Sequence, residues 1–184
     1  DIEACNGEEV TIDFTTDNTV GVTTYDWSVT GDLIGLPDDT TNITDSNADI
    51  TFTASNPDPE PREVTITVTP IFTNDGVTCT TDQQQTFTIT VNPEPQIDDF
   101  TQTICEGGAF DTITPENDTN GVVPSGTTYT WVIADESSDL VIGGSASTAP
   151  SATIPGSELT LADGTTSPQD LIYTVTPNTE EGCD

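Results

Sequence analysis

The chain has 184 residues, of which 33 are acidic and one, Arg62, is basic, and it contains neither Lys nor His. Its formal net charge of -32 repels nucleic-acid phosphates and anionic lipid headgroups, so we expect neither as a partner. No run of apolar residues approaches the roughly 20 that a membrane-spanning helix requires, so we expect no direct insertion of this segment into a membrane.

Short alternating segments separated by Gly, Asn, Asp and Pro run through the first half of the chain. β-Branched and aromatic residues recur at every second position in them, which is the pattern of strands with one buried face. The predicted strands are residues 10–14, 22–29, 50–52, 64–68 and 87–91. Several short strands at this spacing, with no sustained helical period, predict an antiparallel β-sandwich.

The sequence contains two copies of one pattern, at a period of about 104 residues. Four landmarks recur in the same order. The landmarks and their counterparts are Cys5-Asn6-Gly7-Glu8 and Cys105-Glu106-Gly107-Gly108, Tyr25-Asp26-Trp27 and Tyr129-Thr130-Trp131, residues 64–70 and residues 171–177, and Cys79 and Cys183. A period of this length corresponds to a whole domain rather than to a solenoid unit of roughly 20–50 residues.

Two prolines, Pro93 and Pro95, follow the last predicted strand of the first copy and favour an extended, stiff connector. The sequence therefore predicts an all-β protein in which two tandem immunoglobulin-like antiparallel β-sandwiches are joined by a short Pro-containing linker. We expect the first sandwich in residues 1–92, the linker in residues 93–99 and the second sandwich in residues 100–184. The second copy stops before any counterpart of the last strand, so we expect it to lack that strand and the chain to be a segment of a longer protein.

Each copy has one tryptophan within a predicted central strand, Trp27 and Trp131. We expect both indole rings to pack into the core of their sandwich. The alternative is an exposed platform on which sugar rings stack, as in carbohydrate-binding modules.

The four cysteines fall two per copy, near its start and near its last strand. We do not expect zinc, because the chain has neither CxxC spacing nor His. The positions favour one structural disulfide within each copy, Cys5–Cys79 and Cys105–Cys183, each of which closes a loop of about 75 residues and requires an oxidising compartment. The alternative is a Cys79–Cys105 pair across the linker, which leaves Cys5 and Cys183 to neighbouring repeats.

The landmarks resemble the PKD-like repeats of very large cell-surface proteins of Bacteroidota, including the SprB-type mobile adhesins exported by the type IX secretion system. The resemblance rests on the Cys-x-Gly opening, the Tyr-x-Trp strand, the Tyr-Thr-Val-Thr-Pro strand before the second cysteine and the exit Thr-Ile-Thr-Val-Asn-Pro-x-Pro. The Trp-Asp-Phe-Gly-Asp-Gly signature of PKD domains proper is absent, and residues 25–29 stand nearby instead. The resemblance implies an immunoglobulin-type sandwich, surface display, adhesion and, for gliding members, transport along the cell by a motor beneath the outer membrane.

Catalysis needs a base, a nucleophile or a metal ion at a defined site. Without His or Lys, the chain cannot form Ser–His, Cys–His or Ser–Lys arrangements, and its cysteines are assigned to disulfides. A pair of carboxylates can hydrolyse glycosides, but among 33 acidic residues two neighbours are expected by chance. We therefore expect no enzymatic activity and no catalytic residue.

Calcium is the cofactor that the acidic residues could bind, because Ca²⁺ takes carboxylate oxygens as ligands. The candidate ligands are Glu94, Asp98 and Asp99 in or beside the linker, the pair Asp38-Asp39, and the acidic residues of the segment from Asp45 to Asp49. None of these groups matches the EF-hand or the Gly-Asp nonapeptide pattern. The other interpretation is a solvated acidic face that keeps a long filament soluble and self-repelling, with no cofactor.

Short glycosylation patterns also occur. Residues 39–41 and 111–113 match the Asp-Thr pattern of bacterial O-glycosylation, and residues 42–44 and 117–119 match the N-linked sequon. Such matches are frequent by chance in a chain this rich in Thr.

These observations predict a structural spacer in a very long secreted adhesin filament at the cell surface, attached to the outer membrane and serving attachment and gliding motility. We expect the full-length protein to contact surface polysaccharide or another external substratum, and the secretion and motility machinery of the outer membrane. Two other classes remain open, namely a carbohydrate-binding module of a secreted enzyme and an S-layer or matrix component, including one from a halophile.

Overall fold

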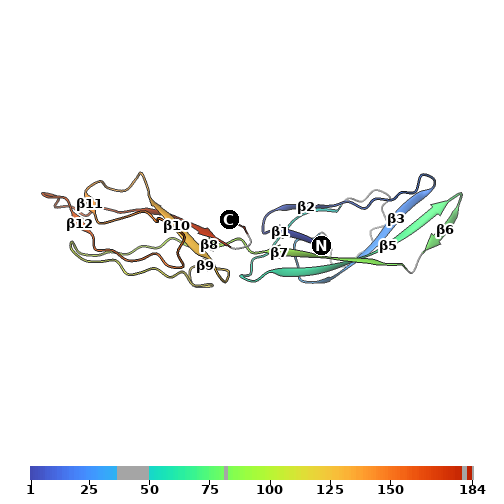
Figure 1. Cartoon of the computed structure of the whole chain (residues 1–184), viewed down its shortest axis with the longest axis horizontal. Coiled ribbons are helices and arrows are strands. Elements are labelled where there is room, and N and C mark those ends of the chain that lie inside the picture. The colour runs from blue at the N-terminus through green and yellow to red at the C-terminus, as the bar shows by residue number, and fades with distance from the viewer. Residues whose placement is uncertain (37–49, 81–82, 180–181, 184) are drawn as a thin grey trace. The chain divides into compact units, whose positions relative to one another are not determined.

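A computed structural model describes residues 1–36, 50–80, 83–179 and 182–183. The chain divides into two compact units, unit 1 (Asp1–Pro93) and unit 2 (Glu94–Asp184). Every regular element in the described residues is a β-strand (Figure 1). The predicted all-β class with two tandem sandwiches is therefore confirmed. Within the described ranges, no helix is long and apolar enough to cross a bilayer.

Unit 1 consists of one large and one small sheet. The large sheet has the strand order β1 (Ile2–Cys5), β7 (Gln85–Asn92), β5 (Arg62–Asn74) and β3 (Val22–Gly31), with β6 (Val77–Thr80) paired to the end of β5. The small sheet pairs β2 (Glu9–Ile12) with β4 (Ile50–Thr53). All five predicted strands are present, but the sequence analysis missed β1 and β6. It also made β5 too short, because this strand has 13 residues rather than the predicted residues 64–68.

Alternation along the strands produces the core of unit 1. In β5 the side chains of Val64, Ile66 and Val68 are buried, whereas the Thr residues between them are partly exposed. Ile89 and Val91 of β7 are fully buried beside them. The small sheet supplies Val10, Ile12, Ile50 and Phe52 to the same cluster. Since burial of one such side chain contributes about 1.5–3 kcal/mol, this layer accounts for the attachment of the two sheets to each other.

Both tryptophans lie in the cores, as expected. Trp27 is 2% exposed and Trp131 is 8% exposed. The indole Nε1 of Trp131 donates a hydrogen bond to the Ser145 carbonyl oxygen at 3.0 Å. The alternative interpretation, an exposed sugar-stacking platform, is therefore wrong for these two residues.

Strand β1 pairs with β7 in parallel, with Ile2 opposite Ile89 and Cys5 opposite Asn92. Since β7 ends where the chain leaves unit 1, this register places Cys5 at the exit of the unit. The buried side chain of Asn56 stabilises this end, because its Nδ2 donates to the Val91 carbonyl oxygen at 2.8 Å. Its backbone N–H donates to Asn6 Oδ1 at 2.8 Å.

Unit 2 is built from shorter strand pairs. The pairs are β8 (Gln96–Ile97) with β9 (Gly121–Val122), β10 (Thr128–Ile133) with β13 (Tyr173–Asn178), and β11 (Val141–Ile142) with β12 (Thr160–Leu161). The first pair corrects the predicted linker of residues 93–99, because residues 96–97 of that segment form a strand within unit 2. The connector is therefore shorter than the sequence indicated.

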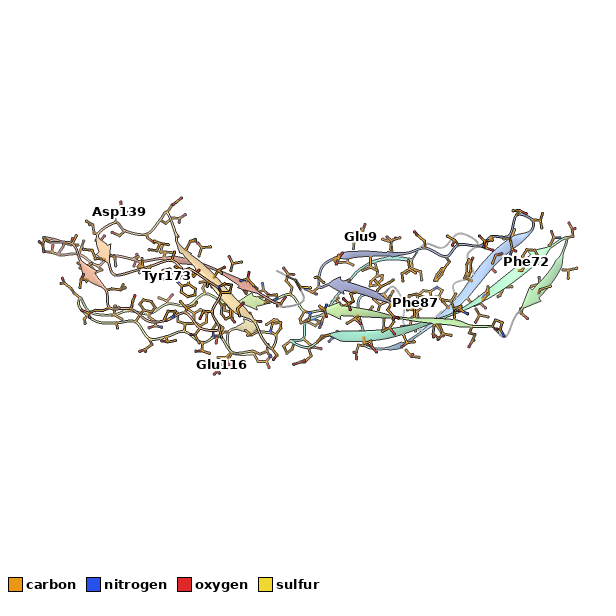
Figure 2. The ribbon with its side chains drawn as sticks, in the orientation of Figure 1. Glu9, Phe72, Phe87, Glu116, Asp139 and Tyr173 are labelled. Atoms are coloured by element: carbon orange, nitrogen blue, oxygen red, sulfur yellow. The ribbon has the colours of Figure 1, made fainter. Side chains whose placement is uncertain are left out.

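The core of unit 2 is much smaller than that of unit 1. Its buried cluster in the described residues is Tyr129, Trp131 and Ile154, against 13 residues in unit 1. Tyr173 points toward the interior, whereas Glu116 and Asp139 point outward (Figure 2). No strand in the described part of unit 2 corresponds to β7, and residues 102–105, the counterparts of β1, form no strand. Without an equivalent of β7 these residues have no strand with which to pair.

Val64→Ala tests the core of unit 1. Val64 is 0% exposed, so we expect its truncation to lower the free energy of unfolding by about 2–3 kcal/mol through lost burial and a residual cavity. The matched control is Val22→Ala in the adjacent strand, where the side chain is 51% exposed and the expected change is below about 0.5 kcal/mol. Urea denaturation of unit 1 measures both, and equal losses would contradict the assigned core.

Candidate functional site

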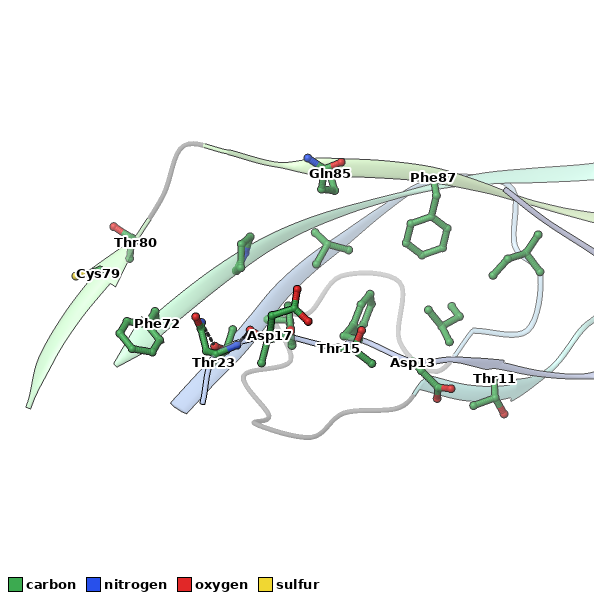
Figure 3. A pocket seen from close by; sticks show the side chains of 18 of the residues that line it. Thr11, Asp13, Thr15, Asp17, Thr23, Phe72, Cys79, Thr80, Gln85 and Phe87 are labelled. Atoms are coloured by element: carbon green, nitrogen blue, oxygen red, sulfur yellow. Dashed lines mark hydrogen bonds between the residues drawn. The ribbon is translucent and has the colours of Figure 1, made fainter. Parts of the chain in front are cut away.

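Unit 1 contains an apolar cleft of about 880 Å³. Phe72, Gln85 and Phe87 line one side of it, and Asp13, Thr15 and Asp17 line the other (Figure 3). These two sides come from the β5–β6–β7 region of the large sheet and from the segment that follows β2. Inside, the rings of Phe14 and Tyr25 lie 5.2 Å apart between centroids.

The chemistry of this cleft favours apolar packing over catalysis. Ligand sites of this volume usually combine apolar walls with a few polar groups that converge on one point. Here the polar groups interact within the wall, as when Asn18 Nδ2 donates to Thr23 Oγ1 at 3.0 Å. The single arginine does not line the cleft, and its guanidinium pairs with Asp58 at 2.7 Å. No arginine side chain is therefore available in the cleft to bind an anionic ligand.

The described residues contain no buried carboxylate that could act as a general acid. The buried polar side chains among them are Asn56 and Thr127. In the core of unit 2, burial raises the pKa of the Tyr129 hydroxyl, which finds no hydrogen-bond partner among the described residues. A raised pKa keeps this phenol neutral, as suits a packing residue rather than a base.

The Cys-x-Gly landmark forms the same turn in both units. In unit 1 the Glu8 N–H donates to the Cys5 carbonyl oxygen at 3.1 Å, and in unit 2 the Gly108 N–H donates to that of Cys105 at 2.9 Å. The third residue of each turn, Gly7 or Gly107, has a positive φ of 84° or 76°. A bonded turn with positive φ at this position is of type II, which requires Gly or Asn there.

The cysteines do not pair as predicted. Cys79 and Cys105 carry exposed free thiols, whereas Cys5 and Cys183 are disulfide-bonded. The predicted pairs Cys5–Cys79 and Cys105–Cys183 are therefore wrong, and so is the alternative pair Cys79–Cys105.

Geometry within unit 1 explains the first of these corrections. Arg62 of β5 lies opposite Val91 at the Cys5 end, and Phe72 of the same strand lies opposite Cys79. Ten residues of strand span about 33 Å. The Cα atoms of a disulfide lie within about 7 Å, so these two cysteines cannot meet.

Comparison with known proteins gives one match. The profile of the PKD-like domain family matches residues 2–95 and again residues 102–184. The chain belongs to the PKD-like domain family. Neither the curated proteins nor the solved structures gave a match. PKD-like domains are typically extracellular, non-catalytic repeat modules, and the match supports this class for both units.

The acidic residues of the PKD-like units do not gather into a metal site in the described part of the chain. No group of three or more potential ligands is present there, and Glu94, Asp98 and Asp99 are exposed. The candidate ligands Asp38 and Asp39 and those of the segment from Asp45 to Asp49 lie outside the described residues.

The glycosylation patterns within the described residues lie in different local environments. Thr112 is exposed, and its Oγ1 accepts a hydrogen bond from the Gly156 N–H at 3.3 Å. The side-chain oxygen of Asn117 accepts a hydrogen bond from the Val123 N–H at 3.1 Å, and this bond holds the Asn117 amide against the backbone. The patterns at residues 39–41 and 42–44 lie outside the described residues.

The sequence analysis missed the cleft and the separation of Cys5 from Cys79 in the first PKD-like unit. One signal was available for the separation. Asp75-Gly76 is a strong hairpin signal, and Cys79 follows it by three residues at the far tip of a long hairpin. The aromatic lining of the cleft carries no such signal, because Phe14 and Phe72 are typical of ordinary core strands.

The thiol assignment predicts the outcome of alkylation. Iodoacetamide added to the folded, unreduced chain should modify Cys79 and Cys105, which are exposed, and leave Cys5 and Cys183 unmodified. After reduction in denaturant all four should react. Mass spectrometry of the digested protein locates the modified residues, and modification of Cys5 in the unreduced chain would contradict the assignment.

Proposed function

We propose that this chain is a repeat segment of a very long secreted adhesin filament, in which it acts as an extended spacer and adhesive stalk during surface attachment and gliding motility. The observation that carries this proposal is the occurrence of two PKD-like units in tandem, each opening with the same bonded Cys-x-Gly turn. A module that repeats with its turn geometry conserved suits a role in which length and regularity matter.

The distribution of charge supports a filament in solvent. The carboxylates of the described residues lie at the surface, as the outward side chains of Glu9, Glu116 and Asp139 illustrate (Figure 2). A surface of one sign keeps neighbouring copies apart by repulsion and keeps them soluble. Such a surface also disfavours collapse of a filament onto the anionic surface of a cell.

The proposed location is the outside of the cell, with the full-length protein attached to the outer membrane. Adhesion would involve surface polysaccharide or another external substratum, through weak contacts spread over many repeats or through a distal part of the filament. The other proposed partners are the secretion and motility machinery of the outer membrane. The typical extracellular role of PKD-like domains supports this location.

The rival classes have less support. A carbohydrate-binding module needs an exposed row of aromatic rings, but both tryptophans are buried, and the one large aromatic side chain exposed among the described residues is Phe100. An S-layer or matrix component from a halophile predicts dependence on molar salt, which the next experiment tests.

The net charge predicts how salt affects stability. We expect the chain to be folded in about 10 mM salt and its melting temperature to rise toward about 150 mM, because the Debye length falls from about 30 Å to about 8 Å and screens the repulsion among carboxylates. Circular dichroism melting curves measure this dependence. A chain that is unfolded until salt reaches molar concentrations would support the halophile alternative instead.

Beads coated with an antibody against this segment test the function on live cells of the source organism. We expect beads to bind and to travel along the cell, since a motile surface filament carries whatever is attached to it. Beads coated with an unrelated antibody are the control. Beads that bind and stay in place would reduce the proposal to a stationary stalk, and an absence of binding despite antigen in the lysate would remove the surface filament.

A further inference from the structure

Strands β10 and β13 of unit 2 reproduce the pairing of β3 with β5 in unit 1. Trp131 of β10 lies opposite Val175 of β13, as Trp27 of β3 lies opposite Val68 of β5. The two pairs are both antiparallel and have the same register. Strand β13 is therefore the counterpart of β5, which runs through the middle of the large sheet of unit 1.

The second edge of β13 is open in the described residues. Strand β5 has β3 on one side and β7 on the other, whereas β13 pairs with β10 alone in the part of unit 2 that the structure describes. A strand with one unpaired edge presents a row of N–H and C=O groups to which a further strand can bind. Unit 1 shows which kind of strand fits at this edge, because β7 occupies the equivalent position there.

The hydrogen bonds of β13 show which of its backbone groups face the open edge. The Ala134 N–H donates to the Ile172 carbonyl oxygen at 2.9 Å, so Ile172 faces β10. Alternate residues of an antiparallel strand bond to the same neighbour, so the N–H and C=O groups of Tyr173 and Val175 point away from β10. Among the described residues, these groups have no backbone hydrogen-bond partner, so they can bond to an incoming strand.

The side chains at this edge are less well covered in unit 2 than in unit 1. Val64 and Ile66 of β5 are both 0% exposed, and two residues of β7 belong to the same core cluster. The counterparts of Val64 and Ile66, which are Leu171 and Tyr173, are only partly buried. The described residues of unit 2 therefore lack the cover that β7 supplies in unit 1.

The lengths of the two strands differ for the same reason. Strand β5 begins at Arg62, but β13 begins at Tyr173, and Leu171 and Ile172 do not belong to a strand. The counterparts of Leu171 and Ile172 in β5 pair with residues of β7. The part of the strand that pairs with β7 in unit 1 is thus the part that is incomplete in unit 2.

We propose that the open edge of β13 is a docking site for one extended strand of a partner polypeptide, which pairs antiparallel to β13 as β7 pairs with β5. In this mode of recognition, backbone hydrogen bonds supply affinity and alternate side chains supply specificity. Phe87 of β7 lies opposite Ile66, so the equivalent apolar side chain of the partner strand lies opposite Tyr173. This site goes beyond the proposed function and does not depend on it.

The sequence of β7 indicates the chemistry of the partner strand. Phe87, Ile89 and Val91 alternate with Thr in β7, which contains no charged residue. Such alternation gives a strand one apolar face for the core and one polar face for solvent. A chain with 33 acidic residues and one basic residue repels an acidic segment. The partner strand is therefore uncharged or basic and has apolar residues at alternate positions.

Pro177 limits the length of the pairing. By the same alternation its backbone faces the open edge, but proline has no N–H to donate. Its counterpart, Pro70, lies beyond Val68, which is the last residue of β5 that pairs with β7. The partner strand accordingly pairs with residues 171–175 and does not extend past Pro177.

Amide exchange measured by NMR tests the docking site on the full chain. The probe is an acetylated and amidated peptide with the sequence of β7, Gln85–Asn92, added to the isotope-labelled chain at up to about 1 mM. We expect the amides of Tyr173 and Val175 to exchange about tenfold more slowly with the peptide, because they gain hydrogen bonds. The amides of β5 are the internal control and should not change, since β7 already occupies their edge.

Two N-methylated peptides distinguish pairing at the edge from non-specific apolar contact. In β7 the odd-numbered residues face β5 and the even-numbered residues face β1. A peptide methylated at the Phe87 and Ile89 nitrogens should therefore not bind β13, whereas one methylated at the Thr86 and Thr88 nitrogens should bind. Equal protection of the β13 amides by both peptides would overturn the proposal.

A fused copy of the β7 sequence tests whether the strand is supplied within one chain instead. The copy follows the C-terminus through a flexible linker of about 10 residues, and the control carries Phe87→Asp and Ile89→Asp in the fused copy alone. The indole NMR signal of Trp131 reports the melting of unit 2, and that of Trp27 reports unit 1. We expect the fused copy and the saturating free peptide each to raise the melting temperature of unit 2 by about 5 °C and to leave unit 1 unchanged.

The remaining outcomes identify other occupants of the edge. Stabilisation by the fused copy without binding of the free peptide would overturn donation by a partner, and no effect of either would overturn the docking site itself. Sedimentation of the chain alone tests a second copy that pairs through its own β13 edge. A dimer in which Tyr173 and Val175 are protected without peptide would replace the partner strand by that copy, whereas a monomer supports the proposal.

Discussion

Strand β7 lies between β1 and β5, and its pairing with both determines the shape of unit 1. It contributes the fully buried Ile89 and Val91 to the core, and it holds β1 in the register that brings Cys5 to the exit of the unit. Unit 2, whose described residues contain no equivalent strand, has a buried cluster of three residues and leaves the counterpart of β1 without strand structure. The contrast between the units shows how much one central strand contributes to a thin sandwich.

The same register determines whether the two cysteines of unit 1 can form a disulfide with each other. Because β5 continues for 13 residues and ends in the β6 hairpin, Cys79 lies about 33 Å from the Cys5 end. A disulfide between Cys5 and Cys79 is thereby impossible, because these two cysteines lie near opposite ends of unit 1.

Apolar and acidic residues occupy different positions in the fold. Val, Ile and Thr alternate along the strands and form the core and its flanks, while Asp and Glu occupy turns and outward positions. The fold therefore tolerates a net charge of -32, because the carboxylates remain in solvent and are separated along the surface. The apolar cleft of unit 1 is the exception to this division, since the partly buried side chains of Phe14 and Phe72 line it.

The sequence by itself determined the all-β class, the two-fold repetition and the burial of Trp27 and Trp131, because alternation and period are local properties that every strand carries. It did not determine the parallel pairing of β1, the early start of unit 2 at β8 or the bonding of the cysteines. Those depend on which distant segments become neighbours and in what register. The position of a cysteine within the repeat identifies its counterpart in the other copy. Only the length of β5 in the folded unit shows that Cys79 is too far from Cys5 for a disulfide.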